Sequence, residues 1–541
     1  MDETKLATTV PQAMIETATA VADWVIVLPM ALALMGAALL VMTRRAGNFS
    51  GGVAILIVVA IIACEVELLL DVIESGPVSM TMGRWLPPFG ISFTADVFGA
   101  GFALTSALAS LIVIFYMMMD RAVDDNRDGQ YALVLLLLAG VTGSFLTGDI
   151  FNLYVWFEVM LIASFGLLVI GNTSLQIDGA VKYGFLNFLA TTLFLLALGL
   201  IYALLGTLNM ADLIGKAETA NPVAMVGIAG LLMLAFGMKA AAFPVNGWLP
   251  GSYHTPPAAV SALFAGVLTK VGIFAMLRTL VFLFPDARDS LEPVLVALAV
   301  LTLVIAPLGA IAETNLRRGI GFVVIGGVGV ILAGIAIPNL RGVAGAGFYI
   351  FHAILTMTAL YLVAGLIEKV TGQTDTRRMG GVYAANSPLS ILFMVLVLAV
   401  AGVPPFLGFW PKLLLIEAGF EAAGLANIDS VALGWNGVLV VLAIVLNAFL
   451  TLIAGTRLWA HIFWRAGPEG ALSEHGQKPV MALARKEVWL GLAPAAVLVG
   501  AIALLGLFPN VVLDAAWIAA ADIIDPARYI AAVGLAPEVP L

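Results

Sequence analysis

The chain has 541 residues, of which 62% are hydrophobic and only 11% are charged. A soluble domain carries about 25% charged residues, and the mean hydropathy here is +1.07. This composition excludes a soluble globular protein and indicates a polytopic membrane protein. The formal net charge is −9, but most acidic residues lie in the loops and termini, so we infer no nucleic-acid partner. The single cysteine, Cys64, lies in an apolar run and cannot form an internal disulfide.

Apolar runs long enough to cross a bilayer recur along the whole chain. A hydrocarbon core of about 30 Å needs roughly 20 apolar residues per helix, and we place about fourteen such runs. They begin near Ala20, Gly52, Asp96, Tyr131, Ile150, Val181, Pro222, Pro257, Pro293, Gly319, Ala344, Pro388, Trp435 and Val488. The N-terminal stretch MDETKLATTV lacks the basic region of a cleavable signal peptide, so we expect the first span to be retained.

The distribution of Lys and Arg between the runs predicts the orientation of the chain. The odd-numbered loops contain Arg44, Arg45, Arg121, Arg127, Lys182, Arg317, Arg318, Lys369, Arg377, Arg378, Arg465, Lys478, Arg485 and Lys486. The even-numbered loops and the termini hold far fewer. We therefore expect a multi-pass protein of the cell (inner) membrane with both termini on the non-cytoplasmic side. The longest loop, Trp464 to Glu487, is too short for a soluble domain, so the chemistry must lie within the membrane.

Four ionisable residues lie within apolar runs: Glu158, Lys239, Lys270 and Lys412. A charge at bilayer depth costs about 2.5 to 3.5 kcal/mol even on insertion scales, and such residues usually mark ion paths or pair with one another. The structural alternatives are a buried ion pair, or a lysine whose ammonium reaches the membrane interface. We interpret the four as candidates for ion translocation.

Two of these lysines lie beside a proline-interrupted helix. Lys239 immediately precedes AAAFPVNGWLP, and Lys412 immediately follows AGVPPFLGFWP. Proline removes a backbone donor, and broken spans at corresponding places in two halves of a transporter point to ion sites. The alternative is a proline kink that only shapes packing. A kink with a lysine, occurring twice, favours the ion site.

Several stretches together resemble a known family. They are GRWLPPFGISFTADVFGA, TGDIFNLYVWFEVML, GMKAAAFPVNGWLPGSYHTPPAAVSALFAGVLTKVG, FHAILTMTALYLVAGLIEK and PPFLGFWPKLLL. They resemble the antiporter-like proteins shared by Mrp sodium/proton antiporters and respiratory complex I. TRLWAHIFW, late in the chain, makes the D-type subunit of Mrp complexes the most similar member. The resemblance covers nearly the whole chain.

The resemblance implies an all-α polytopic membrane fold of about fourteen transmembrane helices, with two inverted five-helix repeats and broken seventh and twelfth helices. Helices 1–3 would occupy residues 1–125, and the first repeat, helices 4–8, residues 126–290. The second repeat, helices 9–13, would occupy residues 291–465, and the C-terminal helix and tail residues 466–541. A proton path would run along a hydrophilic axis at mid-membrane.

The resemblance also implies roles for single residues. Glu158 and Lys239 match an ion pair whose opening gates proton movement. Desolvation disfavours a charged lysine whereas a nearby carboxylate favours it, so breaking the pair can switch Lys239 between proton acceptor and donor. Lys270 and Lys412 match the lysines of the eighth and twelfth helices. His254, in SYHTPPAA, is either a relay between Lys239 and Lys270 or a polar loop histidine.

The chain departs from the family pattern in its second half. Val323, Gly326 and Gly327 stand in polar positions of the tenth helix, and Met357 replaces a lysine of the eleventh. One histidine of a pair is also missing, which leaves His352. We therefore expect the path from Lys270 to Lys412 to be drier than in the family. Either water bridges this gap or the second half does not conduct.

The second span contains an unusual acidic stretch, CEVELLLDVIE. Glu67 and Asp71 are four residues apart and share a helix face, whereas Glu65 points away from it. Acids in a span that reaches lipid are costly unless they face a partner subunit or a water-filled cavity. We interpret Glu67 and Asp71 as a cation-attracting site shared with a neighbouring subunit, with the alternative that they only approach the interface.

We predict that the chain is the proton channel of a multisubunit Na⁺/H⁺ antiporter, which uses a Glu-Lys-Lys relay at mid-membrane. Other membrane subunits, protons, Na⁺ and the lipid bilayer would be its partners. The chain has no metal-ligand spacing, catalytic triad or haem ligand pair, so we expect a transporter subunit without a cofactor rather than an enzyme. One alternative is a proton-pumping subunit of a redox-driven respiratory or hydrogenase-type complex. Another is a non-conducting scaffold, or an energising partner for inorganic-carbon uptake.

Overall fold

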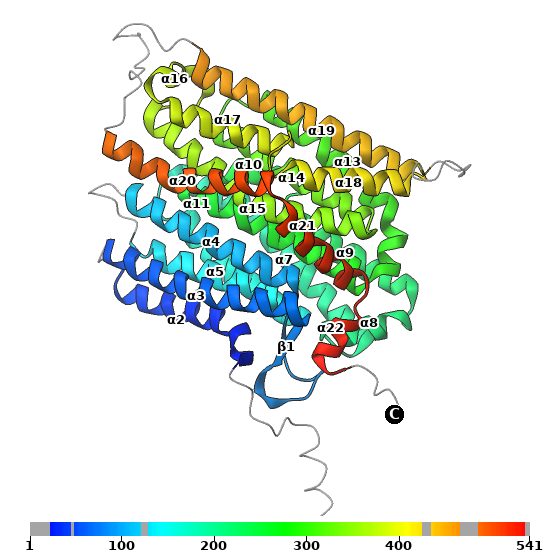
Figure 1. The fold of residues 1–541 in the computed structure, drawn as a ribbon. Helices are drawn as coiled ribbons and strands as arrows, with labels where there is room; N and C mark the ends of the chain where they lie inside the picture. The colour runs from blue at the N-terminus through cyan, green and yellow to red at the C-terminus, as the bar shows by residue number, and fades with distance from the viewer. Residues whose placement is uncertain (1–21, 45–47, 121–127, 425–433, 466–484, 536–541) are drawn as a thin grey trace, which may run out of the picture.

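The computed structural model describes residues 22–44, 48–120, 128–424, 434–465 and 485–535. Nearly all of this part is helical, as predicted (Figure 1). Arg45, Arg121, Arg127, Lys478 and most of the predicted loop from Trp464 to Glu487 lie outside the described residues.

The elements follow one another in this order along the chain. The first part contains η2 (Ala22–Ile26), α2 (Leu28–Met42), α3 (Asn48–Ser75), β1 (Val78–Thr81), η3 (Met82–Arg84), β2 (Ser92–Ala95), α4 (Val97–Asp120), α5 (Gln130–Leu146), α6 (Ile150–Leu168), α7 (Ser174–Leu205), α8 (Met210–Glu218) and α9 (Pro222–Ala240). The middle contains α10 (Trp248–Ser252), α11 (Ala258–Leu263), η4 (Phe264–Leu268), α12 (Thr269–Leu277), η5 (Arg278–Leu283), α13 (Pro285–Ala312), α14 (Leu316–Ala336) and α15 (Leu340–Thr371). The last part contains η6 (Thr376–Arg378), α16 (Val382–Ala385), α17 (Ser387–Ala401), α18 (Phe409–Ala422), α19 (Trp435–Trp459), η7 (Ala460–Trp464), α20 (Arg485–Leu507), α21 (Asn510–Ile524) and α22 (Ala527–Val533).

The long helices lie side by side in one bundle (Figure 1). Helices α2 to α4 form one flank, α17 to α19 form the opposite flank, and α15 lies between them (Figure 1). Helix α15 packs against α14, α18, α20, α21 and α4. Helices α14 and α15 and the segment Ala258–Leu283 are the most buried of the apolar spans. The centre of the bundle is therefore built from the helices that carry Lys270 and His352.

The apolar runs predicted from the sequence coincide with helices. Ten helices of the described part are long and apolar enough to cross a membrane, and α2, α5 and α17 are shorter apolar helices. Helices α20 and α21 would form a further span, but they are bent by 77° at the break between them. The prediction of an all-helical membrane protein is confirmed, whereas fourteen spans and two inverted repeats stay predictions.

The start of α13 differs from its prediction by eight residues. The apolar run was expected near Pro293, but the helix begins at Pro285 and contains Asp286, Arg288 and Asp289 in its first turns. Proline is favourable at the first helical position because its fixed φ suits the helix and no donor is lost there. The polar residues are therefore helical although they are not part of the apolar run.

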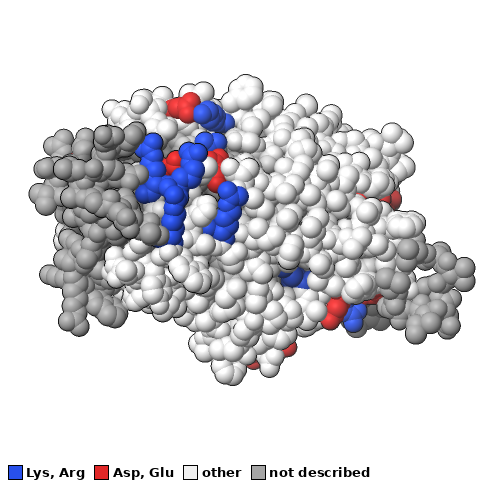
Figure 2. Space-filling model, turned by 90° about the horizontal axis from the view of Figure 1, so that it is seen from above, with Lys and Arg blue, Asp and Glu red and all other residues white. Residues whose placement is uncertain are grey.

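The loops gather at the two ends of the bundle in alternation. At one end, β2 pairs with β1 and bridges to Thr147, while Asp149 bridges to Asn209. At the other end, Asn315 bridges to Asp375, and Arg465 donates to the Arg377 carbonyl. Figure 2 shows Lys and Arg gathered mainly at one end of the face in view, with a broad uncharged belt beside them. This arrangement fits a protein that spans a bilayer; which end faces the cytoplasm stays a prediction.

Both proline-rich stretches interrupt helices. Helix α9 ends at Ala240, Ala241 has a φ of 62°, and the chain resumes helical form at Trp248 of α10. Helix α17 ends at Ala401, Gly402 has a φ of 85°, and α18 begins at Phe409. The last carbonyls of a helix have no partner within it, so each break supplies acceptors within the bundle.

Candidate functional site

Lys239 lies in the last turn of α9, immediately before the first break. It is buried, and its Nζ lies 4.8 Å from the centroid of the Phe157 ring of α6. The negative end of the helix dipole favours a cation at this position. Glu158 of α6 is half-buried and acts electrostatically on Lys239. No ion pair within 4.0 Å joins these two described residues, so the predicted pair is open in this structure.

A small cavity of about 10 Å³ lies beside Lys239. It is lined by Met160, Leu161, Tyr183, Asn187, Lys239, Trp248, Tyr253 and Leu268. This volume is close to the minimum that one water molecule needs. The Tyr253 hydroxyl is buried and has no hydrogen-bond partner among the described residues. A water molecule here would therefore find polar partners next to the Lys239 ammonium.

Lys270 lies on α12, which packs directly against α9. A β-carbon built at Gly272 would lie 3.1 Å from the Lys239 Cβ, so glycine allows the two helices to approach closely here. Two π-helical turns, η4 and η5, precede and follow α12. The Lys270 Nζ donates to the Ala265 carbonyl of η4 at 2.5 Å and to the Thr269 Oγ1 at 3.2 Å. Single π turns are frequent at functional sites.

Lys412, in the first turn of α18, and His352 lie beside the second break. The Lys412 Nζ donates to the carbonyls of Val400 and Ala401, at 3.0 and 2.9 Å, in the last turn of α17. His352 of α15 is fully buried, and its Nδ1 lies 3.1 Å from the Thr356 Oγ1. Its Nε2 has no partner within the described chain. Both Lys270 and Lys412 act electrostatically on His352, which places the histidine within range of both lysines.

Five of the predicted residues thus follow one another in space through the bundle. Glu158 lies near Lys239, the helix of Lys239 packs on the helix of Lys270, and His352 lies within range of Lys270 and Lys412. The three lysines are at most 5% exposed, and none of them forms an ion pair with a carboxylate in the described part of the chain. Buried lysines usually pair, so this arrangement is typical of a functional site.

The surroundings of α14 are less apolar than the residues of α14 and α15 alone suggested. Gly326 and Gly327 of α14 leave room for polar groups from other helices: the Asn447 amide of α19 and the Tyr349 ring of α15. The Asn447 Nδ2 donates to the Leu303 carbonyl at 2.8 Å. Val323 is half-buried and Met357 is buried. The sequence of α14 alone could not predict these polar groups, because other helices contribute them.

His254 lies at the end of the bundle that carries the basic loops. It is half-buried between α10 and α11, and its Nδ1 lies 2.9 Å from the Pro250 carbonyl. Burial lowers its pKa, and the nearby charges of Arg318, Arg317 and Lys182 lower it further. A role for His254 as a relay between Lys239 and Lys270 stays a prediction.

The acids of the second span lie on opposite faces of α3, as predicted. Glu67 and Asp71 are exposed, whereas Glu65 is completely buried. The described residues contain no group of three His, Cys, Asp or Glu side chains that could hold a metal ion. A cation-attracting role for Glu67 and Asp71 stays a prediction.

The sequence reasoning missed a buried charge cluster at the end of the bundle that carries β1 and β2. Arg278, the first residue of η5, forms an ion pair with Asp96, and both are about 2% exposed. The guanidinium also lies over the rings of Phe274, Phe282 and Tyr529. Arg278 is an ionisable residue in an apolar run, so the signal that selected the lysines was present here as well.

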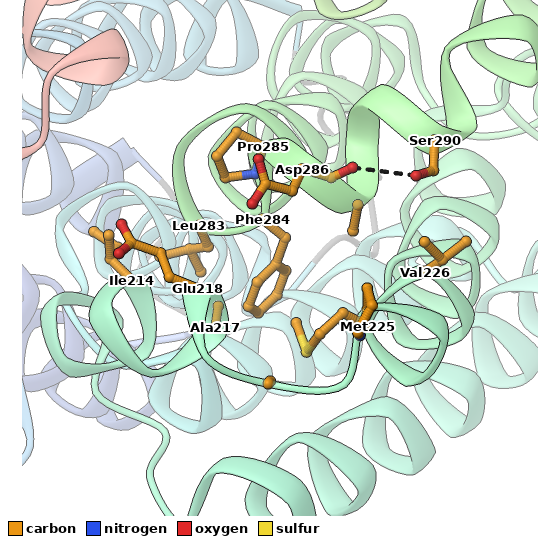
Figure 3. A pocket seen from close by; sticks show the side chains of 13 residues that line it. Ile214, Ala217, Glu218, Met225, Val226, Leu283, Phe284, Pro285, Asp286 and Ser290 are labelled. Atoms are coloured by element: carbon orange, nitrogen blue, oxygen red, sulfur yellow. Dashed lines mark hydrogen bonds between the residues drawn. The ribbon is translucent and has the colours of Figure 1, made fainter.

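A separate pocket of about 110 Å³ lies between α8, the start of α9 and the start of α13 (Figure 3). Apolar side chains line most of it, with the carboxylates of Glu218 and Asp286 beside them (Figure 3). None of the predicted site residues lines this pocket, so we do not assign it to ion translocation.

Known proteins are similar to this chain in both sequence and fold. The chain is 35% identical over 467 residues to the D-type subunit of the Na(+)/H(+) antiporter of Bacillus subtilis (strain 168), covering 86% of this chain and 90% of the relative. It is similar to a chain of the Mrp complex from Dietzia sp. DQ12-45-1b, with 29% identity, a TM-score of 0.84, and coverage of 95% and 100%. It is also similar to a chain of the archaeal membrane-bound sulfane sulfur reductase, with 26% identity, a TM-score of 0.81, and coverage of 94% and 99%.

The antiporter subunits among these relatives are transporter components and not enzymes. Residues 147–434 match the family described as NADH:quinone oxidoreductase/Mrp antiporter, TM. This range includes Glu158, Lys239, Lys270, His352 and Lys412. The predicted resemblance is confirmed, and the chain belongs to the NADH:quinone oxidoreductase/Mrp antiporter transmembrane family.

Proposed function

We propose that the chain is an ion-translocating membrane subunit of a multisubunit Na⁺/H⁺ antiporter. In this proposal Glu158, Lys239 and Lys270 form the main proton relay at mid-membrane, and His352 and Lys412 extend it into the second half of the chain. Further membrane subunits complete the complex, and the location is the cell membrane with both termini on the non-cytoplasmic side. The similarity to the D-type subunit of an antiporter and to a chain of the Mrp complex supports this assignment.

One observation carries the relay. Three lysines are buried, and none forms an ion pair with a carboxylate among the described residues. The helices of Lys239 and Lys270, α9 and α12, pack against each other, and α15, which carries His352, packs against both α12 and α18, the helix of Lys412. An unpaired cation buried in a protein costs several kcal/mol, so its presence needs a compensating use. A lysine can lose its proton in such surroundings and regain it when a carboxylate approaches. The open arrangement of Glu158 and Lys239 matches a step in which Lys239 has handed its proton on.

Proton movement in vesicles that contain the whole complex tests the relay. Glu158→Gln and Lys239→Ala should reduce Na⁺-driven proton movement, read with a pH-sensitive dye, to the level of empty vesicles. Lys182→Ala is the control, because Lys182 is exposed and its one ion pair among the described residues is with Asp178, one turn away. Insertion and assembly should be unchanged in all three variants. Normal transport by both Glu158→Gln and Lys239→Ala would refute the relay.

A second candidate function is proton pumping powered by electron transfer in other subunits of a complex. The similarity to a chain of the sulfane sulfur reductase, a respiratory membrane complex, favours this candidate. The three buried lysines, Lys239, Lys270 and Lys412 (the lysine row), would serve both functions, since neither requires a redox centre in this chain. Purification of the complex separates them: small membrane subunits without redox cofactors support the antiporter, and iron–sulfur proteins support the pump.

A further inference from the structure

Glu65 is a carboxyl that the proposed relay does not use. It lies in the part of α3 nearer to the β1–β2 end of the bundle, and its side chain is 0% exposed. Its neighbours Glu67 and Asp71 on the same helix are exposed. Of these three acidic side chains, Glu65 therefore points into the protein and the other two point away from it.

The contacts of the carboxyl leave one oxygen without a partner. The Thr142 hydroxyl of α5 donates to the Glu65 Oε1 at 3.2 Å. The Oε2 is buried and accepts no hydrogen bond from any described residue. A buried polar atom without a partner costs about 1 to 3 kcal/mol, and more when it is charged.

The helices around Glu65 bring no cation to it. Helix α3 packs against η2, α2, α4 and α5. Helices α2 and α5 contain no acidic or basic residue, and α4 has only Asp120, at its far end. The other titratable residues on these elements are Asp23, Cys64, Glu67, Asp71, Glu74, Tyr116 and Tyr131.

A proton fits this site better than a metal cation. An isolated carboxylate in an apolar interior is so costly that the group takes up a proton instead. Hard cations require about six or more oxygen ligands, whereas Glu65 shares its site with one hydroxyl oxygen. A proton on Oε2 removes the charge with no further ligand.

Glu65 contacts α5, and α5 in turn packs against α6, the helix that carries Glu158. Gly143, next to Thr142, packs against the Trp156 ring of α6, and Gly140 packs against the Met160 backbone. Glu158 lies between these two residues of α6, so it is at a similar level of the bundle. Helix α5 therefore stands between the two carboxyls.

We propose that Glu65 is a reversible proton-binding site in the wall of the bundle, separate from the lysine row. Its Oε2 takes a proton from water to form a neutral carboxylic acid, and it returns the proton to water when the carboxylate forms again. This inference rests on α3 and α5 alone and is independent of the antiporter assignment.

Infrared difference spectroscopy of the reconstituted complex tests the proposal, because a protonated carboxylic acid has a carbonyl band that a carboxylate lacks. We expect a band that disappears reversibly as the pH is raised from about 5 to about 10 and that is missing in Glu65→Gln. Glu67→Gln, two residues away and exposed, is the matched control and should keep the band. Thr142→Val should move the band to higher frequency, because the carbonyl oxygen loses its donor.

Two results would overturn the proposal. A spectrum unchanged by Glu65→Gln would mean that Glu65 carries no exchangeable proton. A band that is lost in Glu65→Gln but does not respond to pH in the parent would mean a permanently protonated, structural group. If Glu65→Gln does not assemble, the band shift in Thr142→Val still decides: no shift would exclude Glu65 as the titrating carboxyl.

Discussion

Lys270 and Arg278 lie eight residues apart on one helical segment, and replacing each by methionine should change the free energy of unfolding by very different amounts. Arg278 forms an ion pair with Asp96, and the Asp96 carboxylate also accepts a hydrogen bond from the Gly99 N–H at 2.7 Å. Removing one partner of a buried pair costs about 3 to 5 kcal/mol, since a buried charge is left uncompensated. Each ring contact of the guanidinium adds about 0.5 to 2 kcal/mol. Arg278→Met should therefore lower the free energy of unfolding by at least about 3 kcal/mol.

Lys270 should behave differently because it has no carboxylate partner. Its ammonium donates to the Ala265 carbonyl and the Thr269 hydroxyl, both neutral. Lys270→Met leaves these two acceptors unpaired, at about 1 to 3 kcal/mol each, but it removes a buried cation whose desolvation costs several kcal/mol. The two effects nearly cancel. We expect a change in stability of about 1 kcal/mol or less, together with loss of transport.

Thermal unfolding of the detergent-solubilised complex, followed by tryptophan fluorescence, measures both variants. Transport in vesicles supplies the second readout, and Lys182→Met at an exposed site is the control. Equal destabilisation by Lys270→Met and Arg278→Met would refute the reasoning, because Lys270 would then have a structural role like that of Arg278.

Three further predictions concern other parts of the chain. Lys412→Ala should impair transport less than Lys239→Ala, because the helices before Lys412 have lost polar residues; equal loss in vesicles would show that the second half conducts. Burial raises the pKa of Asp149 to about 6, so the folded state keeps a proton that the unfolded chain releases near pH 4. The stability of the folded state should therefore fall as the pH rises from about 4 to 6. The asparagine in Asp149→Asn can still cap α6, so this variant should have a higher melting temperature than the parent at about pH 7.5 but not at about pH 4. Glu67→Gln with Asp71→Asn should weaken binding of a neighbouring subunit, and unchanged co-purification would place these acids at the lipid interface.

The sequence predicted the helices well because a bilayer imposes a strong constraint on composition. Runs such as Gly52 onward and Trp435 onward coincide with α3 and α19. The breaks were also predictable, since proline at Pro244 and Pro404 cannot continue a hydrogen-bonded helix. The bend between α20 and α21 was not predicted, although Pro509 lies at the break and gives the same kind of signal.

The site could be predicted residue by residue but not as a set of contacts. The apolar surroundings of Lys239 and Lys270 identify them as buried, yet only the fold shows that Gly272 lets their helices touch. The acceptors of Lys412 are backbone carbonyls, which no side-chain pattern reveals. The relation of His352 to both Lys270 and Lys412 depends on the packing of α15, which joins segments distant in sequence.

The cluster around Arg278 also bears on how the chain is made. Tyr529 of α22 covers the guanidinium and packs against Phe282, but it is synthesised about 250 residues after Arg278. At about 5 to 20 residues per second, translation separates them by roughly 12 to 50 seconds. During that interval Arg278 can contact Phe274 and Phe282 but not the ring of Tyr529. A chain that stops before α22 therefore lacks one of the three rings that cover the Arg278 guanidinium.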